Sequence, residues 1–305
     1  MRLGTVRTAD GGRVVAADGT GVWWVDPRHG NVLDIIENWA AAQPELGGGA
    51  PVDLATVTWR PPVTRPGKVI CVALNNSANK DRIMSGPDHP ATFIKPSSSL
   101  LGHGCAIELD PAWGRVHPEP ELAVVIGTTG RHIPVERAYD HVFGYTIIND
   151  LTAPIMRGED TFHYRAIHPD GDGGVRYVDS WVSYSGRYKG SDGFGPIGPW
   201  VVTRDEIPDP HALAIRCIHD GRLVTEDNTA NLRFHVDAVV AFLSEYMTLE
   251  AGDIVAMGTA LKASGSGGAV QNVDLTVLGG VIEVEIEGIG TLSNPVRTVA
   301  HEVGR

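Results

Sequence analysis

The chain contains 305 residues, of which 42% are hydrophobic and 20% charged, and its net charge is −12 at pH 7 with histidine neutral. This length is enough for one large domain or two smaller ones, and the acidic balance disfavours nucleic acid or an anionic membrane as a partner. No run of about 18 apolar residues is present, so we expect no membrane-spanning segment. The N-terminus has no apolar signal segment and the three cysteines are scattered, so we expect reduced thiols in a cytoplasmic protein.

The first 60 residues are predicted to form a small α/β unit of their own. Strand-like runs at 13–16 and 22–25 flank an Asp-Gly turn signal, and Asn31 can cap a short amphipathic helix. A proline-rich stretch follows, which is typical of a linker or of the entry to a second domain. We therefore expect two domains, a small one at 1–60 and a larger one at 61–305.

The larger domain is predicted to consist mainly of strands. Its apolar, β-branched runs are short, which is typical of buried strands, and one clear amphipathic helix is expected at 236–247. The expected strands lie at 68–73, 91–95, 122–127, 142–148, 214–218, 222–225 and 282–286. Because a regular alternation of strands and helices is missing, the pattern favours a β-rich α+β fold over a doubly wound parallel sheet.

Residues 154 to about 188 have no clear hydrophobic period and are rich in Gly, Asp, His, Tyr and Arg. We expect a long loop here, and a loop of this length is usually functional or disordered. The tyrosines and Trp181 argue against disorder, so the segment is a candidate lid over an active site. His163 and His168 could carry protons there, although a solvated position is the simpler interpretation for either one.

Three carboxylates stand where apolar strands begin or end. Glu119 and Glu121 lead into a buried strand, and residues two apart on a strand share a face. Pro118 and Pro120 each lack a backbone donor, which favours the rim of a sheet over a central strand. Two adjacent carboxylates repel each other unless a cation lies between them. A third carboxylate, Asp150, stands at the end of another apolar strand. The pattern predicts a divalent-metal site, with an acidic, solvated strand end as the alternative.

Six segments along the chain match one family pattern in their order and spacing. They are EPELAVVIG at 119–127, GYT with ND at 144–150, KGSDGFGPIGPW at 189–200, NT at 228–229, LEAGDIVAMGT at 249–259 and GIGTLSNPV at 288–296. Each motif is weak alone, but together they resemble the fumarylacetoacetate hydrolase family over roughly residues 65 to 297. The first 60 residues would be the variable N-terminal part.

The resemblance implies a mixed β-sandwich roll, usually a homodimer, with Mg²⁺ or Mn²⁺ held by Glu119, Glu121 and Asp150. It also implies a small-molecule substrate, a keto acid or β-dicarbonyl compound whose oxygens chelate the metal. The reactions implied are C–C hydrolysis, decarboxylation, keto–enol tautomerisation and dehydration or ring closure, mostly through an enolate. The elementary chemistry agrees, because three carboxylates leave a divalent ion open positions for substrate, and the ion can stabilise enolate charge as a Lewis acid.

Three further residues match positions that the family uses. Lys189 matches the active-site lysine and could stabilise negative charge or move a proton, with an ordinary surface lysine as the alternative. Thr259 matches a position that lines the substrate pocket. Lys95 matches a lysine that follows a phenylalanine, and we expect it to bind substrate, with a salt bridge at the rim as the alternative.

Two departures from the family pattern bear on the reaction. Asn79 and Arg82 stand where the lid motif has the histidine and glutamate that activate water, and neither can accept a proton near pH 7. Pro154 stands where an arginine is usual, with Arg157 close behind it as a substrate-binding candidate. We therefore expect lyase, tautomerase or cyclase chemistry rather than hydrolysis. Arg82 would hold a substrate carboxylate, Asn79 would contact the substrate, and His163 would be the replacement acid/base.

Two other interpretations stay open on the sequence. A non-catalytic homologue that binds metal or ligand could share the fold, but it would be free to lose carboxylates that this chain keeps. A dinucleotide-dependent enzyme is suggested by GSGG at 265–268, but this string lacks the G-x-G-x-x-G spacing and opens no helical pattern. A metal-dependent enzyme is therefore the leading prediction.

Overall fold

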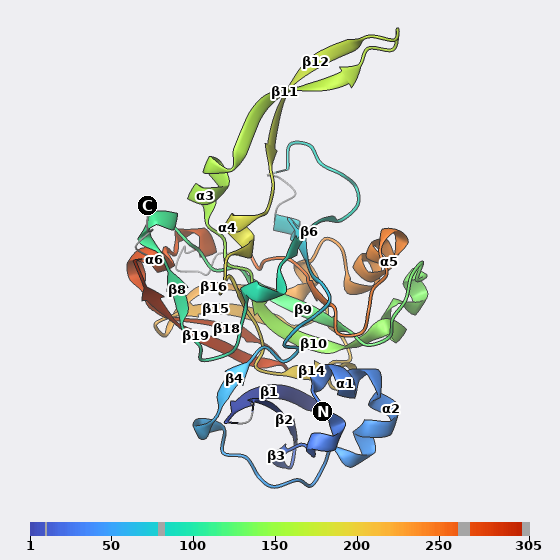
Figure 1. The fold of residues 1–305 in the computed structure, drawn as a ribbon, viewed down its shortest axis with the longest axis vertical. Helices are drawn as coiled ribbons and strands as arrows, with labels where there is room; N and C mark the ends of the chain where they lie inside the picture. The colour runs from blue at the N-terminus through green and yellow to red at the C-terminus, as the bar shows by residue number, and fades with distance from the viewer. Residues whose placement is uncertain (10, 79–82, 262–268, 301–305) are drawn as a thin grey trace.

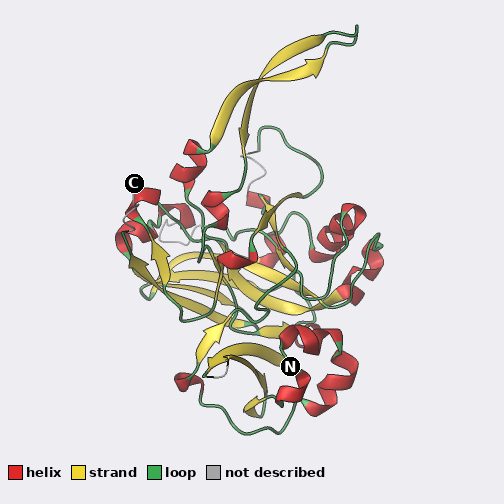
Figure 2. Cartoon of the chain, viewed as in Figure 1, coloured by secondary structure: helices red, strands yellow, loops and turns green. Residues whose placement is uncertain are grey.

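The computed structural model of the protein describes residues 1–9, 11–78, 83–261 and 269–300. Within these ranges the chain forms two large sheets with short helices around them, and a long hairpin extends from the end opposite the N-terminal strands (Figure 1, Figure 2). Strand residues far outnumber helical ones. The predicted β-rich α+β fold is therefore confirmed.

The larger sheet spans the N-terminal unit and the body. In the described part of the chain it has ten strands, in the order β3-β2-β1-β14-β10-β9-β17-β5-β6, with β4 paired to β1. Their bounds are β1 Arg2–Thr8, β2 Gly11–Asp18, β3 Gly21–Trp24, β4 Thr58–Arg60, β5 Val69–Ala73, β6 Ala91–Lys95, β9 Pro120–Ile126, β10 Val142–Asn149, β14 Val201–Thr203 and β17 Ile254–Ala256.

The second sheet lies in the C-terminal half and is mostly antiparallel. Its order is β16-β15-β18-β19-β8, with bounds Arg222–Asn228, Ala214–His219, Gly280–Ile286, Gly290–Thr298 and Ile107–Leu109. Two short strands, β7 Leu100–Leu101 and β13 Gly195–Pro196, pair in parallel. The helices are α1 Val32–Glu37, α2 Trp39–Ala42, α3 Pro154–Glu159, α4 Arg187–Gly190, α5 Val236–Tyr246 and α6 Leu275–Leu278.

Strand β9 is buried on both faces, which explains its unbroken apolar sequence. Leu122, Val124 and Ile126 belong to the core between β9, the second sheet and α5. Ala123 and Val125 point to the other face, into the core that the N-terminal unit shares with the body. The strand is therefore fixed in register, because a slip by one residue would exchange its two faces.

The N-terminal unit is continuous with the body at the level of backbone pairing. Strand β1 pairs antiparallel with β14, with Leu3 opposite Val201. The predicted cap of α1 is present, since Asn31 accepts hydrogen bonds from the backbone of Leu33 and Asp34, and Asp34 bonds back to the Asn31 backbone. The division into domains at 1–60 and 61–305 stays a prediction.

The expected rim position of the acidic strand is wrong. Strand β9 lies between β10 and β17 and is central in the sheet. Pro120 is its first residue, where a missing donor interrupts the ladder least, and its carbonyl accepts a hydrogen bond from Ala260 at 3.1 Å. The Glu119 backbone amide donates to the Asn149 side chain at 2.8 Å instead of to a strand. The carboxylates are therefore at the end of a central strand and not on an exposed rim.

The expected loop after residue 154 is also wrong over most of its length. Strands β11 (Thr161–Pro169) and β12 (Val175–Ser183) form an antiparallel hairpin with nine paired positions. The Asp170 side chain accepts hydrogen bonds from the Asp172 and Gly174 amides at 2.9 Å and so closes the turn. Both strands are rich in aromatic and β-branched residues, but their apolar residues occupy both faces, which hides the strand period.

The three cysteines, Cys71, Cys105 and Cys217, are free thiols, as the sequence predicts. Burial raises the pKa of the Cys217 thiol to about 12, so it is unreactive near neutral pH. No helix of the described residues combines the length and the apolar sequence needed to cross a membrane.

Asn75 fixes the segment that follows β5 against two other elements. Its amide nitrogen donates to the carbonyls of Phe234 and Met257 at 2.9 and 2.7 Å, and its oxygen accepts from the Phe234 amide at 2.7 Å. The side chain is only 1% exposed. It therefore joins the end of β5 to the start of α5 and the end of β17.

Replacing this side chain should destabilise the fold. Asn75→Ala removes the hydrogen bonds of one buried and two partly buried backbone groups, so we expect the free energy of unfolding to fall by about 2–4 kcal/mol. Denaturant unfolding followed by circular dichroism measures the loss. Asn38→Ala, which removes one exposed hydrogen bond to the Asp34 carbonyl, is the matched control. Equal stability of the two variants would contradict the claim that the hydrogen bonds of Asn75 stabilise the fold.

Candidate metal centre and active site

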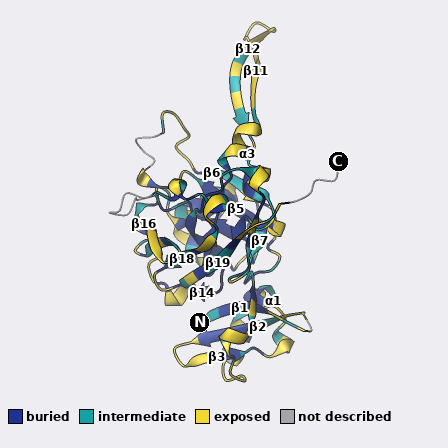
Figure 3. Ribbon diagram, turned by 90° about the vertical axis from the view of Figure 1, so that its left-hand side faces the viewer, coloured by how far each residue is buried: buried dark blue, intermediate teal, exposed yellow. Residues whose placement is uncertain are grey.

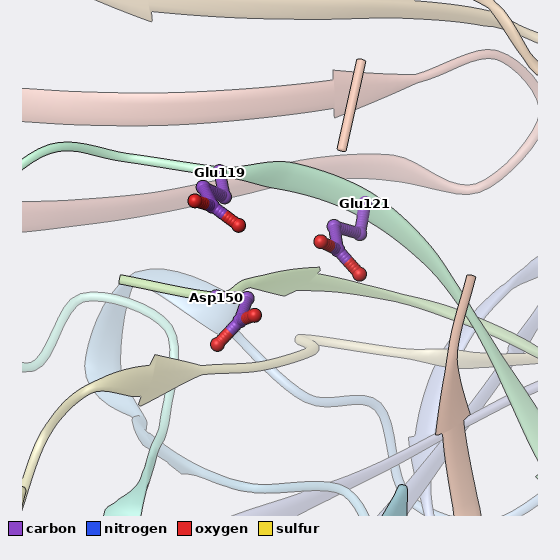
Figure 4. A group of neighbouring side chains, drawn as sticks. All are labelled: Glu119, Glu121 and Asp150. Atoms are coloured by element: carbon purple, nitrogen blue, oxygen red, sulfur yellow. The ribbon is translucent and has the colours of Figure 1, made fainter. Parts of the chain in front are cut away.

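Strand pairing brings the three predicted carboxylates together. Glu121 lies opposite Ile148 in the β9–β10 ladder, and Asp150 follows directly after β10. The Asp150 amide donates to the Glu119 carbonyl at 2.9 Å, which closes this end of the pair. One oxygen from each of Glu119, Glu121 and Asp150 lies within 4.8 Å of the other two, and Figure 4 shows the two glutamates facing the aspartate.

Hydroxyl and amide groups fix the orientation of the glutamates. The Thr259 hydroxyl lies 2.9 Å from one oxygen of Glu119 and 2.9 Å from one oxygen of Glu121. The Thr152 hydroxyl donates to the other Glu119 oxygen at 2.8 Å, and the Gly258 amide donates to Glu121 at 2.9 Å. The carboxylates are therefore held in place by groups that do not depend on a bound ligand.

Two buried lysines compensate part of the negative charge. The Lys189 ammonium lies 2.6 Å from one Asp150 oxygen and 2.8 Å from Glu119. The Lys95 ammonium lies 2.7 Å from the other Asp150 oxygen and also donates to the Lys189 carbonyl. Asp150 is thus bracketed by two cations, whereas Glu121 has no ion pair among the described residues.

The pKa values of these groups follow from burial and from their neighbours. Burial, together with Asp150 and Glu119, raises the pKa of Glu121 well above its ordinary value. Burial would also raise the pKa of Asp150, but Lys189 and Lys95 lower it overall. Burial opposes the charge of Lys189, yet the three carboxylates outweigh it and raise its pKa, so this lysine is a cation at neutral pH.

The donor set fits a hard divalent cation. Three carboxylates supply only oxygen ligands, which Mg²⁺ and Mn²⁺ prefer, and three protein ligands leave positions for water or substrate. Three carboxylates meet only two ammonium groups in the cluster, and neither ammonium forms an ion pair with Glu121 in the described part of the chain. A divalent ion held by Glu119, Glu121 and Asp150 would supply the missing positive charge.

The carboxylates open into a pocket of about 280 Å³. Its polar lining consists of the acids with Lys189, Thr152, Thr259 and Arg157. Its apolar lining consists of Val72, Ala73, Leu74, Phe93 and Tyr188, and the Lys189 ammonium lies 5.2 Å from the centroid of the Phe93 ring. Leu74 adopts a φ of 54°, a left-handed conformation that costs energy for a branched residue. The pocket therefore offers both charged groups and apolar surface to a ligand.

The structure places the remaining predicted residues in three ways. Arg157 and Thr259 line the pocket with the carboxylates, whereas Lys95 is fully buried behind Asp150 and is not part of the lining. His163 lies on the exposed hairpin, stacked on Trp181 with ring centroids 4.1 Å apart, and is also outside the lining. Asn79 and Arg82 lie outside the described residues.

A buried aspartate near the site was missed from the sequence. Asp227 accepts hydrogen bonds from the Asn76 side chain at 3.0 Å, from the Leu261 amide at 2.9 Å and from Asn231 at 2.6 Å. The Asn76 nitrogen also lies 3.3 Å from the Thr259 carbonyl. Asp227 thus links the segment after β5 to the segment that carries Thr259. Its only sequence signal was its position next to the NT motif, because two of its partners, Asn76 and Leu261, are distant in the chain.

Comparison with known proteins identifies a matching family and several similar proteins. The family described as "Fumarylacetoacetate (FAA) hydrolase C-terminal" matches residues 68–297. The mitochondrial oxaloacetate tautomerase Fahd2a of Rattus norvegicus is 34% identical over 265 residues, which cover 87% of this chain and 75% of that protein. The oxaloacetate tautomerase YisK of Bacillus subtilis is 31% identical over 266 residues, covering 86% of this chain and 80% of that protein.

A solved structure is similar over nearly the full length. The maleylpyruvate hydrolase of Sphingobium sp. SYK-6, in complex with manganese(II) and pyruvate, superposes with a TM-score of 0.72 at 28% identity. The alignment covers 98% of this chain and 99% of that one. The similarity therefore includes the N-terminal unit as well as the body.

The charge balance around Asp150 can be tested by removing one cation. Lys95→Met leaves a buried carboxylate less well compensated, so we expect the free energy of unfolding to fall by about 3–5 kcal/mol. Arg137→Met, which breaks an exposed pair with Asp140, should change stability little. Adding Asp150→Asn to Lys95→Met should restore part of the loss, because the two residues interact directly. Additive losses in the double variant would contradict the pairing.

Proposed function

The chain belongs to the fumarylacetoacetate hydrolase family, and from this premise we propose that it is a divalent-metal-dependent enzyme for small keto acids. Tautomerisation or decarboxylation through an enolate is the reaction that we favour. The observation that carries the proposal is the single pocket in which Glu119, Glu121, Asp150 and Lys189 meet. Two relatives named oxaloacetate tautomerases support the choice of reaction.

We propose Mg²⁺ or Mn²⁺ as the cofactor, held by Glu119, Glu121 and Asp150. When bound, such an ion polarises a substrate keto oxygen and stabilises the negative charge of an enolate. The two glutamates are already oriented by Thr152, Thr259 and the Gly258 amide, whereas Lys189 would exchange its contacts with Glu119 and Asp150 for a contact with the substrate. The maleylpyruvate hydrolase structure contains manganese, which supports the choice of ion.

Lys189 is assigned the role of a cation rather than a base. Its pKa is raised, so at neutral pH it holds its proton and points a positive charge into the pocket. A protonated lysine can stabilise a developing oxyanion or give a proton to carbon or oxygen of an enolate. It cannot accept a proton from the substrate without first losing its own.

Arg157 is proposed to bind a substrate carboxylate. Its guanidinium belongs to an exposed side chain that lines the pocket, and no carboxylate among the described residues pairs with it. A planar guanidinium can hold a carboxylate with two parallel hydrogen bonds. The carbon chain of the substrate would then lie along Leu74 and Phe93. A dicarboxylic keto acid fits this arrangement, with one acid group at the metal end and the other at Arg157.

Hydrolysis is disfavoured because the usual water-activating pair is absent from the sequence. Asn79 and Arg82 occupy those positions, and neither accepts a proton near pH 7. General-base assistance is typically worth ~10²–10⁴ in rate, so hydrolysis would be slow without it. The roles of Asn79 and Arg82 in substrate binding stay predictions. His163 lies outside the pocket lining, so we assign no proton transfer to it.

Metal binding should stabilise the folded protein. Mg²⁺ or Mn²⁺ at 100 times its Kd should add about 2.7 kcal/mol of stability, because the ion binds the folded state. Thermal melting with and without metal measures the shift. Glu121→Ala should abolish it, while Glu37→Ala, which removes an exposed glutamate, should keep it. An equal response in Glu121→Ala and in the wild type would refute the proposed ligands.

Activity assays separate the roles of the two pocket cations. With Mg²⁺ present we expect tautomerisation or decarboxylation of oxaloacetate and only poor cleavage of acylpyruvates. Lys189→Met should lower kcat by about 10²–10³, because it removes a charge that acts on the transition state. Arg157→Met should mainly raise KM, because it removes a contact to the bound substrate.

Two results would count against this assignment. Efficient acylpyruvate cleavage by the wild type would show that the protein is a hydrolase despite Asn79 and Arg82. Full activity in Lys189→Met would remove the proposed catalytic cation. Metal-dependent stabilisation without activity on any keto acid would favour the non-catalytic, ligand-binding alternative.

A further inference from the structure

A buried acid at the edge of the second sheet has no part in the proposed reaction. Strand β16 is the edge strand of that sheet, and Figure 3 shows exposed residues on it beside the buried strands of the body. Asp227, the next-to-last residue of β16, is nevertheless only 6% exposed. It does not line the pocket that contains the carboxylate cluster. Its burial therefore calls for an explanation other than contact with a substrate.

Hydrogen bonds from three segments fix the Asp227 carboxylate. One oxygen accepts from the Asn228 amide at 2.8 Å and from the Asn231 side chain at 2.6 Å. The other oxygen accepts from the Asn76 side chain at 3.0 Å and from the Leu261 amide at 2.9 Å. Burial raises the pKa of Asp227, but these hydrogen bonds outweigh it and lower the pKa overall. The carboxylate is therefore an ionised acceptor at neutral pH.

Two of these partners hold the segment that carries Thr259. Leu261 follows Thr259 by two residues, and its amide binds Asp227 directly. The Asn76 nitrogen that binds Asp227 also donates to the Thr259 carbonyl at 3.3 Å. Between these contacts the Ala260 amide donates to the first residue of β9 at 3.1 Å. The Thr259 backbone is therefore fixed by groups that lie outside the carboxylate cluster.

The Thr259 side chain connects this anchoring to the proposed metal ligands. Its hydroxyl lies 2.9 Å from one oxygen of Glu119 and 2.9 Å from one oxygen of Glu121. A hydroxyl has a single proton, so it can serve both glutamates only from a position between them. A rotation of the Thr259 backbone would move the hydroxyl out of that position. The spacing of the two glutamates thus depends on how firmly this backbone is held.

We propose that Asp227 is a positioning residue for the carboxylate cluster, acting through Asn76 and the Thr259 backbone. The inference rests on the proposed function, because it takes the cluster to be a site for a divalent ion. Groups that orient metal ligands through hydrogen bonds typically contribute ~10–100-fold to metal affinity. A carboxylate that only joined β16 to its neighbours would contribute to stability and leave metal affinity unchanged.

Manganese affinity tests the proposal without any turnover. Calorimetric titration of the full chain measures the Kd for Mn²⁺. Asp227→Asn, which replaces one acceptor oxygen with a donor, should raise this Kd by roughly tenfold. Asn76→Ser should have a similar effect, although it leaves the carboxylate in place. The matched control is Asp220→Asn in the turn between β15 and β16, where Asp220 accepts from the Val281 amide at 2.8 Å, and its Kd should be unchanged.

A double-mutant cycle separates positioning from a general loss of stability. Thr259→Val removes the hydroxyl and should itself weaken Mn²⁺ binding. In that background Asp227→Asn should weaken binding no further, because the group through which it acts is gone. Denaturant unfolding of every variant gives the folded fraction, to which each Kd is referred. If Asp227→Asn folds poorly, the same cycle is made with Asn76→Ser.

The outcomes distinguish this inference from the proposed function. A wild type that binds Mn²⁺ and an Asp227→Asn variant with the same Kd would overturn the positioning role and leave the metal site intact. Equal losses from Asp227→Asn in the wild-type and Thr259→Val backgrounds would also overturn it, because the residue would then act independently of the hydroxyl. A wild type that binds no Mn²⁺ would contradict the proposed metal site and this inference with it.

Discussion

The structure depends on how three carboxylates are kept at the paired ends of two central strands. Placing Glu119, Glu121 and Asp150 together in a buried position costs free energy through desolvation and mutual repulsion. Lys95 and Lys189 offset part of that cost at Asp150, but they leave Glu121 without a cation among the described residues. The fold therefore supports a site with excess negative charge, and this is the property that a divalent cation would satisfy.

Most of this arrangement could be predicted from the sequence, because the positions of the three carboxylates follow from local sequence patterns. The period-two rule placed Glu119 and Glu121 on one face, and the end of an apolar run placed Asp150 beside them. The central position of β9 could not be predicted, because its neighbour β17 lies more than a hundred residues later in the chain. Pro118 and Pro120 suggested a rim, although a proline before or at the first position of a strand disturbs a central ladder little.

Whether Lys95 or Lys189 faces the pocket depends on long-range packing, which the sequence does not reveal. Lys95 and Lys189 both matched the family pattern, yet Lys95 is buried behind Asp150 and Lys189 lines the pocket. Asp227 was missed for the same reason, since its partners come from three separate segments. The hairpin after Arg157 was predicted as a loop because apolar residues on both of its faces obscure the alternation that marks a strand.

In the proposed function each part of the pocket has one task. The carboxylates would bind the divalent ion, Lys189 would add a cation, Arg157 would bind a second anionic group, and Leu74 and Phe93 would contribute apolar surface. No conventional water-activating pair stands in the sequence at Asn79 and Arg82. The chemistry that remains begins with loss of CO₂ from a keto acid or with release of an enol hydroxyl proton to water, and in either case Lys189 can return a proton to the enolate carbon.

A crystal structure with Mn²⁺ and oxalate, a mimic of an enolised keto acid, tests the central claim most directly. We predict one manganese ion bound by Glu119, Glu121 and Asp150, identified by its anomalous scattering, with oxalate in the open positions and the Lys189 ammonium beside an oxalate oxygen. Manganese bound elsewhere, or a pocket in which Lys189 still bridges Glu119 and Asp150 with no ion present at saturating metal, would contradict the account.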